Sequence, residues 1–297
     1  FIGFQNAKVI VNSDATLVTL GSFHNVQHGP FMLVALAGVI ITAVLMARNV
    51  RGALLLGIIA STIIGIPLGV TNLANFHPEQ LFHIPSLAPV ALQFDFTSVA
   101  AHPFDFFVVL FTLLLANLFD TVGTLIGVAN KAGLLNKDGK LPNVNKALMA
   151  DAVGTTAGAL LGTSVVAAYV ESAAGVAEGG RTGLTALTVA VLFFLALFIA
   201  PIILLVPAAA TAPALIVVGF LMMEAVMKID MGDLTEGIPA FITIIMMPLT
   251  YSIAEGIIFG VICYVMVKAL SGRKKDIPAV TWVIAAIFLA KFIWLSH

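Results

Sequence analysis

Long apolar runs separated by short polar stretches dominate the chain from about residue 30 onward. An α-helix needs about 20 predominantly apolar residues to cross the hydrocarbon core of a bilayer. The pattern therefore predicts an all-α, polytopic membrane protein. Its apolar segments fall near residues 31–47, 53–70, 104–129, 145–163, 182–206, 209–228, 238–250, 253–271 and 278–296.

The stretch 164–180 departs from this pattern. The run SVVAAYV is short and rich in β-branched and small residues, and Glu171, Ser172 and several glycines follow it. This composition predicts an extended segment that leads into a short half-helix beginning near Glu171. Broken elements at membrane depth are tolerated where they line a cavity, and they often form the binding sites of transporters.

Composition supports the assignment to a membrane. The 297 residues are 60% hydrophobic and 10% charged, and soluble domains carry about 25% charged residues. The net charge of −1 leaves no basic footprint for nucleic acid, and the single cysteine, Cys263, excludes an internal disulfide. Residues 1–10 read as the tail of a spanning helix. We therefore expect the chain to be the C-terminal part, roughly two thirds, of a longer protein.

Lysine and arginine predict the orientation, because cytoplasmic loops carry an excess of them. If each span changes sides and the stretch 164–180 counts as one crossing, every strongly basic connection lies on the same side. Its positive residues are Arg48, Arg51, Lys131, Lys137, Lys140, Lys146, Arg181, Lys228, Arg273, Lys274 and Lys275. The predicted outer side holds Lys8 and, if 278–296 spans the membrane, Lys291. That last segment either spans or lies in the interface, and its sequence does not decide between the two.

An acidic residue, Asp120, lies within the apolar segment 104–129. A carboxylate at the centre of a bilayer costs several kcal/mol, about 3 on insertion scales, so such residues are functional by default. Asn117 and Thr124 are three and four residues away, which places all three side chains on one helix face. The alternative is a structural cluster in which Asp120 bonds a neighbouring Ser or Thr.

Glu171 is the second carboxylate at membrane depth. A half-helix that begins there would present free N–H donors to a ligand acceptor, while the carboxylate accepts from N–H donors of the ligand. The alternative is that Glu171 merely caps its own helix. Nearby, Glu178 and Arg181 are expected to form a local ion pair, and Asp151 is given a supporting role at most.

Motifs for other chemistry are absent from the sequence. Neither an H-E-x-x-H pattern nor a Cys/His spacing predicts a metal site, and no phosphate-binding loop suggests an ATP-driven pump. We expect no cofactor, no metal and no catalytic residue.

Four blocks resemble the AzgA-like purine nucleobase permeases, which belong to the nucleobase–cation symporter group with the xanthine and uracil permeases. The blocks are FIGFQNAKVIVN, LFDTVGTLIGVANKAGL, MADAVGTTAGALLGTS and VESAAGVAEGGRTGLTAL. The resemblance extends over essentially the whole chain, and about the first four spans of the family and most of the fifth have no counterpart.

The resemblance implies two inverted seven-helix repeats divided into core and gate domains. Residues 1–103 would end the first repeat, with the tail of one span, the spans 31–47 and 53–70, and an outer loop. Residues 104–297 would form the second repeat, with core spans 104–129, 145–163 and 182–206 around the broken element, gate spans over 209–271 and the segment 278–296.

The resemblance also implies proton-coupled import of hypoxanthine, guanine or adenine across the inner (plasma) membrane. Asp120 and Glu171 would contact the base, Thr124 would line the site and the Val170 backbone would offer an amide, with Asn117 and Ser172 beside them. Either carboxylate could carry the proton, and a homodimer is one expected assembly.

Two alternatives from the residues stay open. One is a transporter of anions or other small solutes with the same architecture, although carboxylates disfavour an anionic substrate. The other, less favoured, is an intramembrane acid hydrolase, since the GxGD signature of such enzymes is missing.

Overall fold

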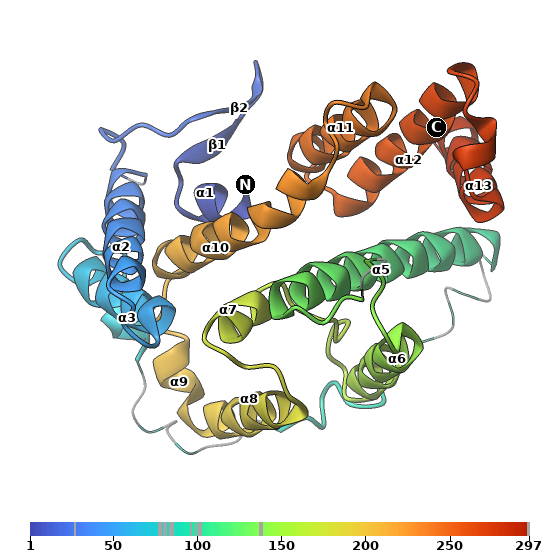
Figure 1. Ribbon diagram of the computed structural model, residues 1–297. Coiled ribbons are helices and arrows are strands. Elements are labelled where there is room, and N and C mark those ends of the chain that lie inside the picture. The colour runs from blue at the N-terminus through green and yellow to red at the C-terminus, as the bar shows by residue number, and fades with distance from the viewer. Residues whose placement is uncertain are drawn as a thin grey trace. The chain divides into compact units, whose positions relative to one another are not determined.

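The computed structural model is rich in helices (Figure 1). It describes residues 1–26, 28–76, 79, 82, 86–95, 97, 99, 103–136 and 139–295. The first part contains α1 (Ile2–Asn6), β1 (Ile10–Ser13), β2 (Leu17–Leu20), α2 (Gly29–Ala47), α3 (Ala53–Gly65) and η1 (Leu73–Asn75). The middle contains α5 (Pro103–Ala132), α6 (Val144–Leu160), α7 (Ser172–Ala177), α8 (Gly183–Ala196), η3 (Leu197–Ile199) and α9 (Ala200–Ile203). The remainder contains α10 (Ala208–Met222), η4 (Met223–Lys228), α11 (Leu234–Thr250), α12 (Ile253–Leu270), η5 (Lys274–Asp276) and α13 (Ala279–Leu295).

Every apolar segment predicted from the sequence contains a helix, and most boundaries agree within a few residues. The segment 182–206 differs, because its helix tightens into a 3₁₀ turn at Leu197–Ile199 before α9 begins. Pro201 lies in the first turn of α9, where its missing N–H costs no hydrogen bond. The predicted loop cation Lys137 and the end of the segment 278–296 lie outside the described residues.

The N-terminal prediction of a helix tail reaching residue 10 is wrong. α1 ends at Asn6, and β1 and β2 then pair as an antiparallel hairpin with Ile10 opposite Leu20. The turn between them is rich in polar residues, and the Thr16 hydroxyl donates to the Val18 carbonyl at 2.9 Å. Short side chains that bond the backbone favour turns over helix, so the expected all-α fold gains a small β-element.

Four helical stretches in the described part of the chain are long and apolar enough to cross a membrane: Gly29–Ala47, Gly183–Ile203, Ala208–Lys228 and Ile253–Leu270. Shorter apolar helices cover Ala53–Gly65, Leu234–Thr250 and Ala279–Ala290. Exposed leucines, isoleucines and phenylalanines cover much of the surface of these helices, as lipid contact requires. The chain is a multi-pass membrane protein.

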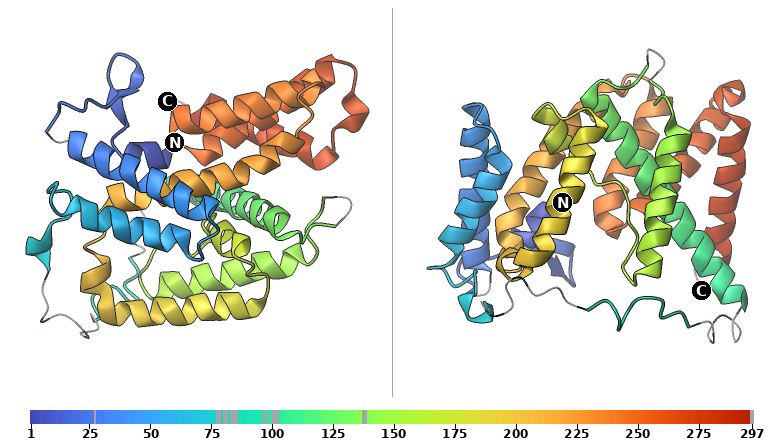
Figure 2. Two further views of the ribbon diagram at one scale, coloured as in Figure 1. Left: turned by 60° about the vertical axis from the view of Figure 1, so that its left-hand side comes forward. Right: turned by 90° about the horizontal axis from the view of Figure 1, so that it is seen from below.

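The chain divides into two compact units, and the first comprises Phe1–Gln93, Ile126–Asn143 and Thr155–Met223. Its core is the packing of α2, α3 and α10 on one another (Figure 2). Small residues allow the close approach: a Cβ atom at Gly38 of α2 would overlap Ser61 of α3 and Pro213 of α10. Without an apolar solvent effect between helices in lipid, such close backbone contact stabilises the assembly.

The second unit comprises Phe94–Leu125, Val144–Gly154 and Glu224–His297. In it α11 and α12 form a hairpin whose turn has Tyr251 in the left-handed region and Ser252 as the N-cap of α12 (Figure 1). The Ser252 hydroxyl accepts from the Glu255 amide at 3.2 Å. α13 packs on α12 through buried Val265, Ile277 and Ala285.

Candidate functional site

The Asp120 carboxylate is half-buried on α5. In the part of the chain that the structure describes, it makes no hydrogen bond or ion pair. Thr124, one turn further, is 5% exposed, and Asn117 is half-buried. The alternative reading, in which Asp120 bonds a neighbouring Ser or Thr, therefore finds no support among the described residues.

The hydroxyl of Thr121, the residue after Asp120, bonds a different carboxylate, that of Asp151. Thr121 is 1% exposed, and its Oγ1 donates to Oδ2 of Asp151 on α6 at 3.1 Å. Asp151 was given a supporting role at most, because it follows Lys146 by five residues and was placed near the membrane surface. The signal was present in the blocks DTVGT and MADAVGT, each of which places polar side chains within an apolar helix.

The predicted half-helix is confirmed. Residues 163–169 form no regular element, and α7 begins at Ser172 with Glu171 as its N-cap residue. The Thr155 hydroxyl of the first unit ties this irregular segment by donating to the Val166 carbonyl at 3.0 Å. The Glu171 side chain is exposed and makes no capping hydrogen bond, so it does not merely cap its own helix.

The expected row of free amides at the start of α7 is wrong. The amides of Ser172, Ala173 and Ala174 donate to the carbonyls of Tyr169, Val170 and Glu171, at 2.9–3.1 Å. Glu171 already has helical dihedral angles, so i to i+3 bonds occupy donors that an abrupt helix start would leave open. The Val170 amide finds no acceptor among the described residues and remains available to a ligand.

The expected site residues fall into two groups. Asn117, Asp120 and Thr124 share α5 within the second unit, whereas Val170, Glu171 and Ser172 are consecutive in the first. The members of each group are neighbours along the chain. That the groups form two walls of one site stays a prediction.

The predicted Glu178–Arg181 ion pair is absent from the described residues. Instead Oε1 of Glu178 accepts from the backbone amide of Gly52, 126 residues earlier in the chain, at 3.2 Å. No group of three His, Cys, Asp or Glu side chains gathers in the described part of the chain as metal ligands would.

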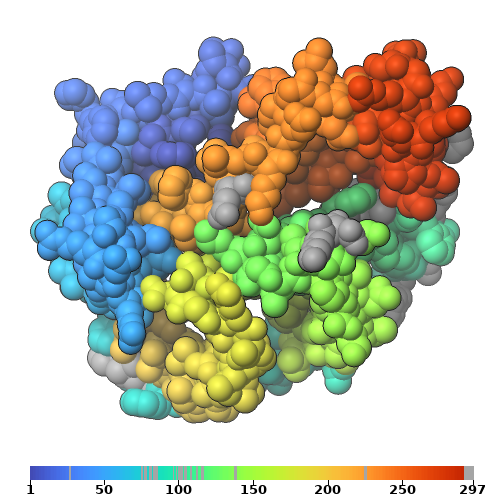
Figure 3. Space-filling model, viewed as in Figure 1, coloured from blue at the N-terminus to red at the C-terminus, as the bar shows by residue number. Residues whose placement is uncertain are grey.

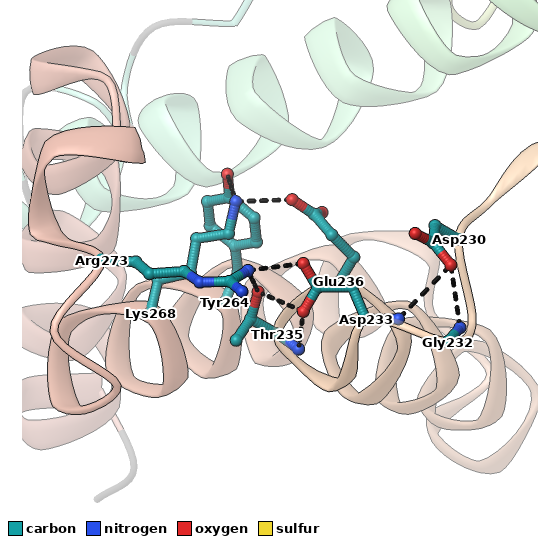
Figure 4. A network of polar contacts seen from close by, with 8 residues as sticks. All are labelled: Asp230, Gly232, Asp233, Thr235, Glu236, Tyr264, Lys268 and Arg273. Atoms are coloured by element: carbon teal, nitrogen blue, oxygen red, sulfur yellow. Dashed lines mark hydrogen bonds and ion pairs between the residues drawn. The ribbon is translucent and has the colours of Figure 1, made fainter.

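A polar network that the sequence pattern did not predict lies at one end of the α11–α12 hairpin (Figure 4). The Lys268 side chain is 7% exposed, and its Nζ donates to Oε1 of Glu236 at 2.5 Å and to Oη of Tyr264 at 2.9 Å. The same ammonium lies 4.5 Å from the centre of the Tyr264 ring. The buried charge is thus fully paired, as a lysine inside an apolar helix requires.

A second pair completes the network. NH1 of Arg273 donates to Oδ2 of Asp233 at 2.6 Å, and Asp233 accepts from the amide and hydroxyl of Thr235, both at 2.9 Å. The bonds from Thr235, followed by that from Arg273, lower the pKa of Asp233 to about 2. A sequence signal existed, since acids open α11 and bases close α12, the arrangement that helix dipoles favour.

Comparison with known proteins shows the family to which the chain belongs. The model of the family described as "Permease family", which covers the xanthine and uracil permeases, matches residues 1–259. The chain belongs to this family, whose members are permeases and not enzymes, as the sequence resemblance predicted.

Three relatives are similar along almost the whole chain. A putative permease of Methanocaldococcus jannaschii, MJ0326, is 48% identical over 297 residues, covering 100% of this chain and 66% of the relative. The adenine permease AdeQ of Escherichia coli is 42% identical, covering 98% and 64%. The guanine/hypoxanthine permease PbuO of Bacillus subtilis is 44% identical, covering 97% and 66%. The chain thus spans just under two thirds of the length of these relatives.

Proposed function

We propose that the protein is a secondary active transporter that imports a purine nucleobase (hypoxanthine, guanine or adenine) together with protons. The observation that carries the proposal is a pair of carboxylates, Asp120 and Glu171, in apolar elements of a chain more than 40% identical to adenine and guanine/hypoxanthine permeases. Neither carboxylate has a protein partner among the described residues, so both can accept from a substrate.

The chemistry of a purine fits these groups. A purine is a flat ring with N–H donors on one edge and ring-nitrogen acceptors on others, so carboxylates match its donors. The Val170 amide, which has no acceptor among the described residues, and the buried Thr124 hydroxyl would supply donors for its acceptors. Asn117 and Ser172 offer further polar contacts beside the two acids.

Proton coupling follows from the cost of moving charge. A carboxylate that closes against an apolar surface favours its protonated form, because burial disfavours the charged one. A proton that binds outside together with the base and is released inside would therefore couple the import of the base to the inward movement of the proton. Either Asp120 or Glu171 can serve as this proton carrier.

The proposal includes the architecture that the family resemblance implies. Residues 1–103 would end one seven-helix repeat and 104–297 would form the inverted second repeat, with core and gate domains in the plasma membrane and a homodimer as the assembly. The binding residues would then lie at the interface of the repeats, where transporters of this kind hold their substrates.

The first test replaces Glu171 by glutamine in the protein encoded by the complete gene. Loss of a hydrogen bond to a charged acceptor corresponds to about 1.5–3 kcal/mol, so uptake of labelled hypoxanthine, guanine or adenine should fall about 10- to 100-fold. Equal amounts of protein in the membrane provide the control. Uptake at the wild-type level would refute the assignment of Glu171.

Asp120→Asn tests the proton role of the other acid. Asparagine retains one acceptor but does not titrate, so binding should weaken while the dependence of uptake on external pH flattens. An unchanged pH dependence would assign the proton to another group.

Competition by adenine, guanine, hypoxanthine, xanthine and uracil in the same assay identifies the substrate class, and inhibition by none of them would refute the nucleobase proposal.

A further inference from the structure

The short helix α7 lies between two acidic residues. At its N-terminal end lies Glu171, and six helical residues later, about 9 Å along the axis, the helix ends at Glu178. In between, Ala173 is fully buried, and α7 packs on α10. In the space-filling view the yellow atoms of this segment border the blue atoms of α2 and α3 (Figure 3).

The contact of Glu178 replaces a missing local cap on α3. In a capping box, an acid three residues into a helix reaches back to the amide of the N-cap residue. The N-cap of α3 is Gly52, which has no side-chain acceptor, and the residue three positions later is the apolar Leu55. Glu178 supplies the acceptor from another part of the chain, and its negative charge is favourable at a helix N-terminus.

The surroundings make this tie specific. Gly52 has a φ of +70°, a conformation that favours glycine, and both Gly52 and Glu178 are exposed. Arg181 is three residues from Glu178, yet no contact between them is found within the described residues. Exposed hydrogen bonds contribute little to global stability. The tie is therefore suited to setting the place of α7 rather than to holding the protein folded.

We propose that Glu178 is a positioning residue that ties α7 to the start of α3 and thereby orients Glu171 for the substrate. The inference rests on the proposed function, since it assigns a role to the helix that carries the proposed substrate-binding acid. It predicts that substrate affinity depends on a side chain that does not touch the substrate.

The first experiment measures the tie without any substrate. Hydrogen exchange, read by mass spectrometry on the complete protein in detergent, should become at least about threefold faster across residues 172–180 in Glu178→Ala. Glu178→Gln keeps an amide oxygen as acceptor and should restore most of the protection. Unchanged exchange in Glu178→Ala would overturn the proposed tie, and this result is independent of whether the protein transports purines.

The second experiment measures uptake by the same variants. Glu178→Ala should raise KM for the transported purine about threefold with little change in thermal unfolding midpoint, and Glu178→Gln should recover most of the loss. Arg181→Gln is the matched control, because it removes a neighbouring charge without touching the Gly52 contact. An unchanged KM in Glu178→Ala, or an equal rise in Arg181→Gln, would overturn the positioning role. Wild-type protein that takes up no purine would instead refute the proposed function.

Discussion

Polar side chains in apolar elements fall into two kinds at the scale of single residues. Lys268, Glu236 and Tyr264 satisfy one another, and such complete pairing is what a structural charge in a membrane protein needs. Asp120 and Glu171 make no such contacts within the described residues. An acid kept at membrane depth without a partner costs stability, so its presence points to a ligand.

Asp233 provides a prediction for stability against pH. Its pKa is about 2 in the folded protein against an ordinary value of 3.8. The stabilisation that the charged carboxylate gives the folded state is therefore complete above about pH 4 and is lost as pH falls towards 2. Asp233→Asn keeps an N-cap acceptor and removes the charge. The variant should unfold a few degrees below wild type at pH 7, and the difference should vanish near pH 2.

Thermal unfolding in detergent measures this difference. Asp14→Asn is the control, because Asp14 lies exposed in the turn of the β-hairpin and makes no hydrogen bond in the described part of the chain. A difference between wild type and Asp233→Asn that stays constant from pH 7 to pH 2 would contradict the assignment.

Site residues were predictable from sequence only where the signal was local. Asp120 and Glu171 stand out because each interrupts an apolar run. The partners Thr121–Asp151 and Glu178–Gly52 are 30 and 126 residues apart, and only the folded chain brings them together. The wrong expectations, the Glu178–Arg181 pair and the free amides of α7, both came from extending a local rule to a place where the fold offered another partner.

At the scale of elements, the close contact of α11 and α12 depends on glycine. A Cβ atom at Gly260 of α12 would overlap the Thr243 side chain of α11, and one at Gly256 would overlap Met247. Such positions allow two helix backbones to approach in lipid. The polar network then joins the far ends of the same two helices.

Gly260→Ala should therefore destabilise the hairpin. Forcing a methyl group into a packed contact costs about 1–3 kcal/mol, which appears as a lower unfolding midpoint. Gly219→Ala in α10 is the matched control, because no atom lies within 4 Å of the added Cβ. Adding Thr243→Ala to Gly260→Ala should recover part of the loss, and equal stability of the two single variants would contradict this packing.

The sequence predicted the helices that are set by the length and apolarity of a segment, and it failed for the hairpin that is set by its turn. The spans from α2 to α13 follow from runs of apolar residues, and the broken element around α7 follows from a change in composition. The β1–β2 hairpin was missed because residues 1–10 were read as the end of a helix. The signal was the pair of short β-branched runs, Ile10–Val11 and Val18–Thr19, on either side of the polar turn residues Ser13, Asp14 and Thr16.

At the scale of the whole molecule, the family and the multi-pass class follow from composition and four sequence blocks. The two inverted repeats stay a prediction, because such an arrangement depends on many distant contacts that no single segment encodes. The orientation can be predicted from the sequence, because it depends on the number of lysine and arginine residues in each short loop.

The orientation can be tested with single cysteines in a Cys263→Ala background. A membrane-impermeant maleimide should label Ser86→Cys, in the connection between α3 and α5, in intact cells. Lys140→Cys and Lys274→Cys should react at least about tenfold less until the membrane is permeabilised, because basic loops stay in the cytoplasm. Labelling of Lys140→Cys in intact cells would reverse the predicted orientation.

The turn at Tyr251 and Ser252 has a consequence for how the protein is made. If α11 and α12 both cross the membrane, the two open ends of their hairpin, with the ions of the network, lie on the same side of it, and the closed end carries Glu255 in the first turn of α12. The two helices could then enter the bilayer together as a preformed pair, led by the end that holds this carboxylate. No lysine, arginine or carboxylate of the network has to be translocated during biogenesis.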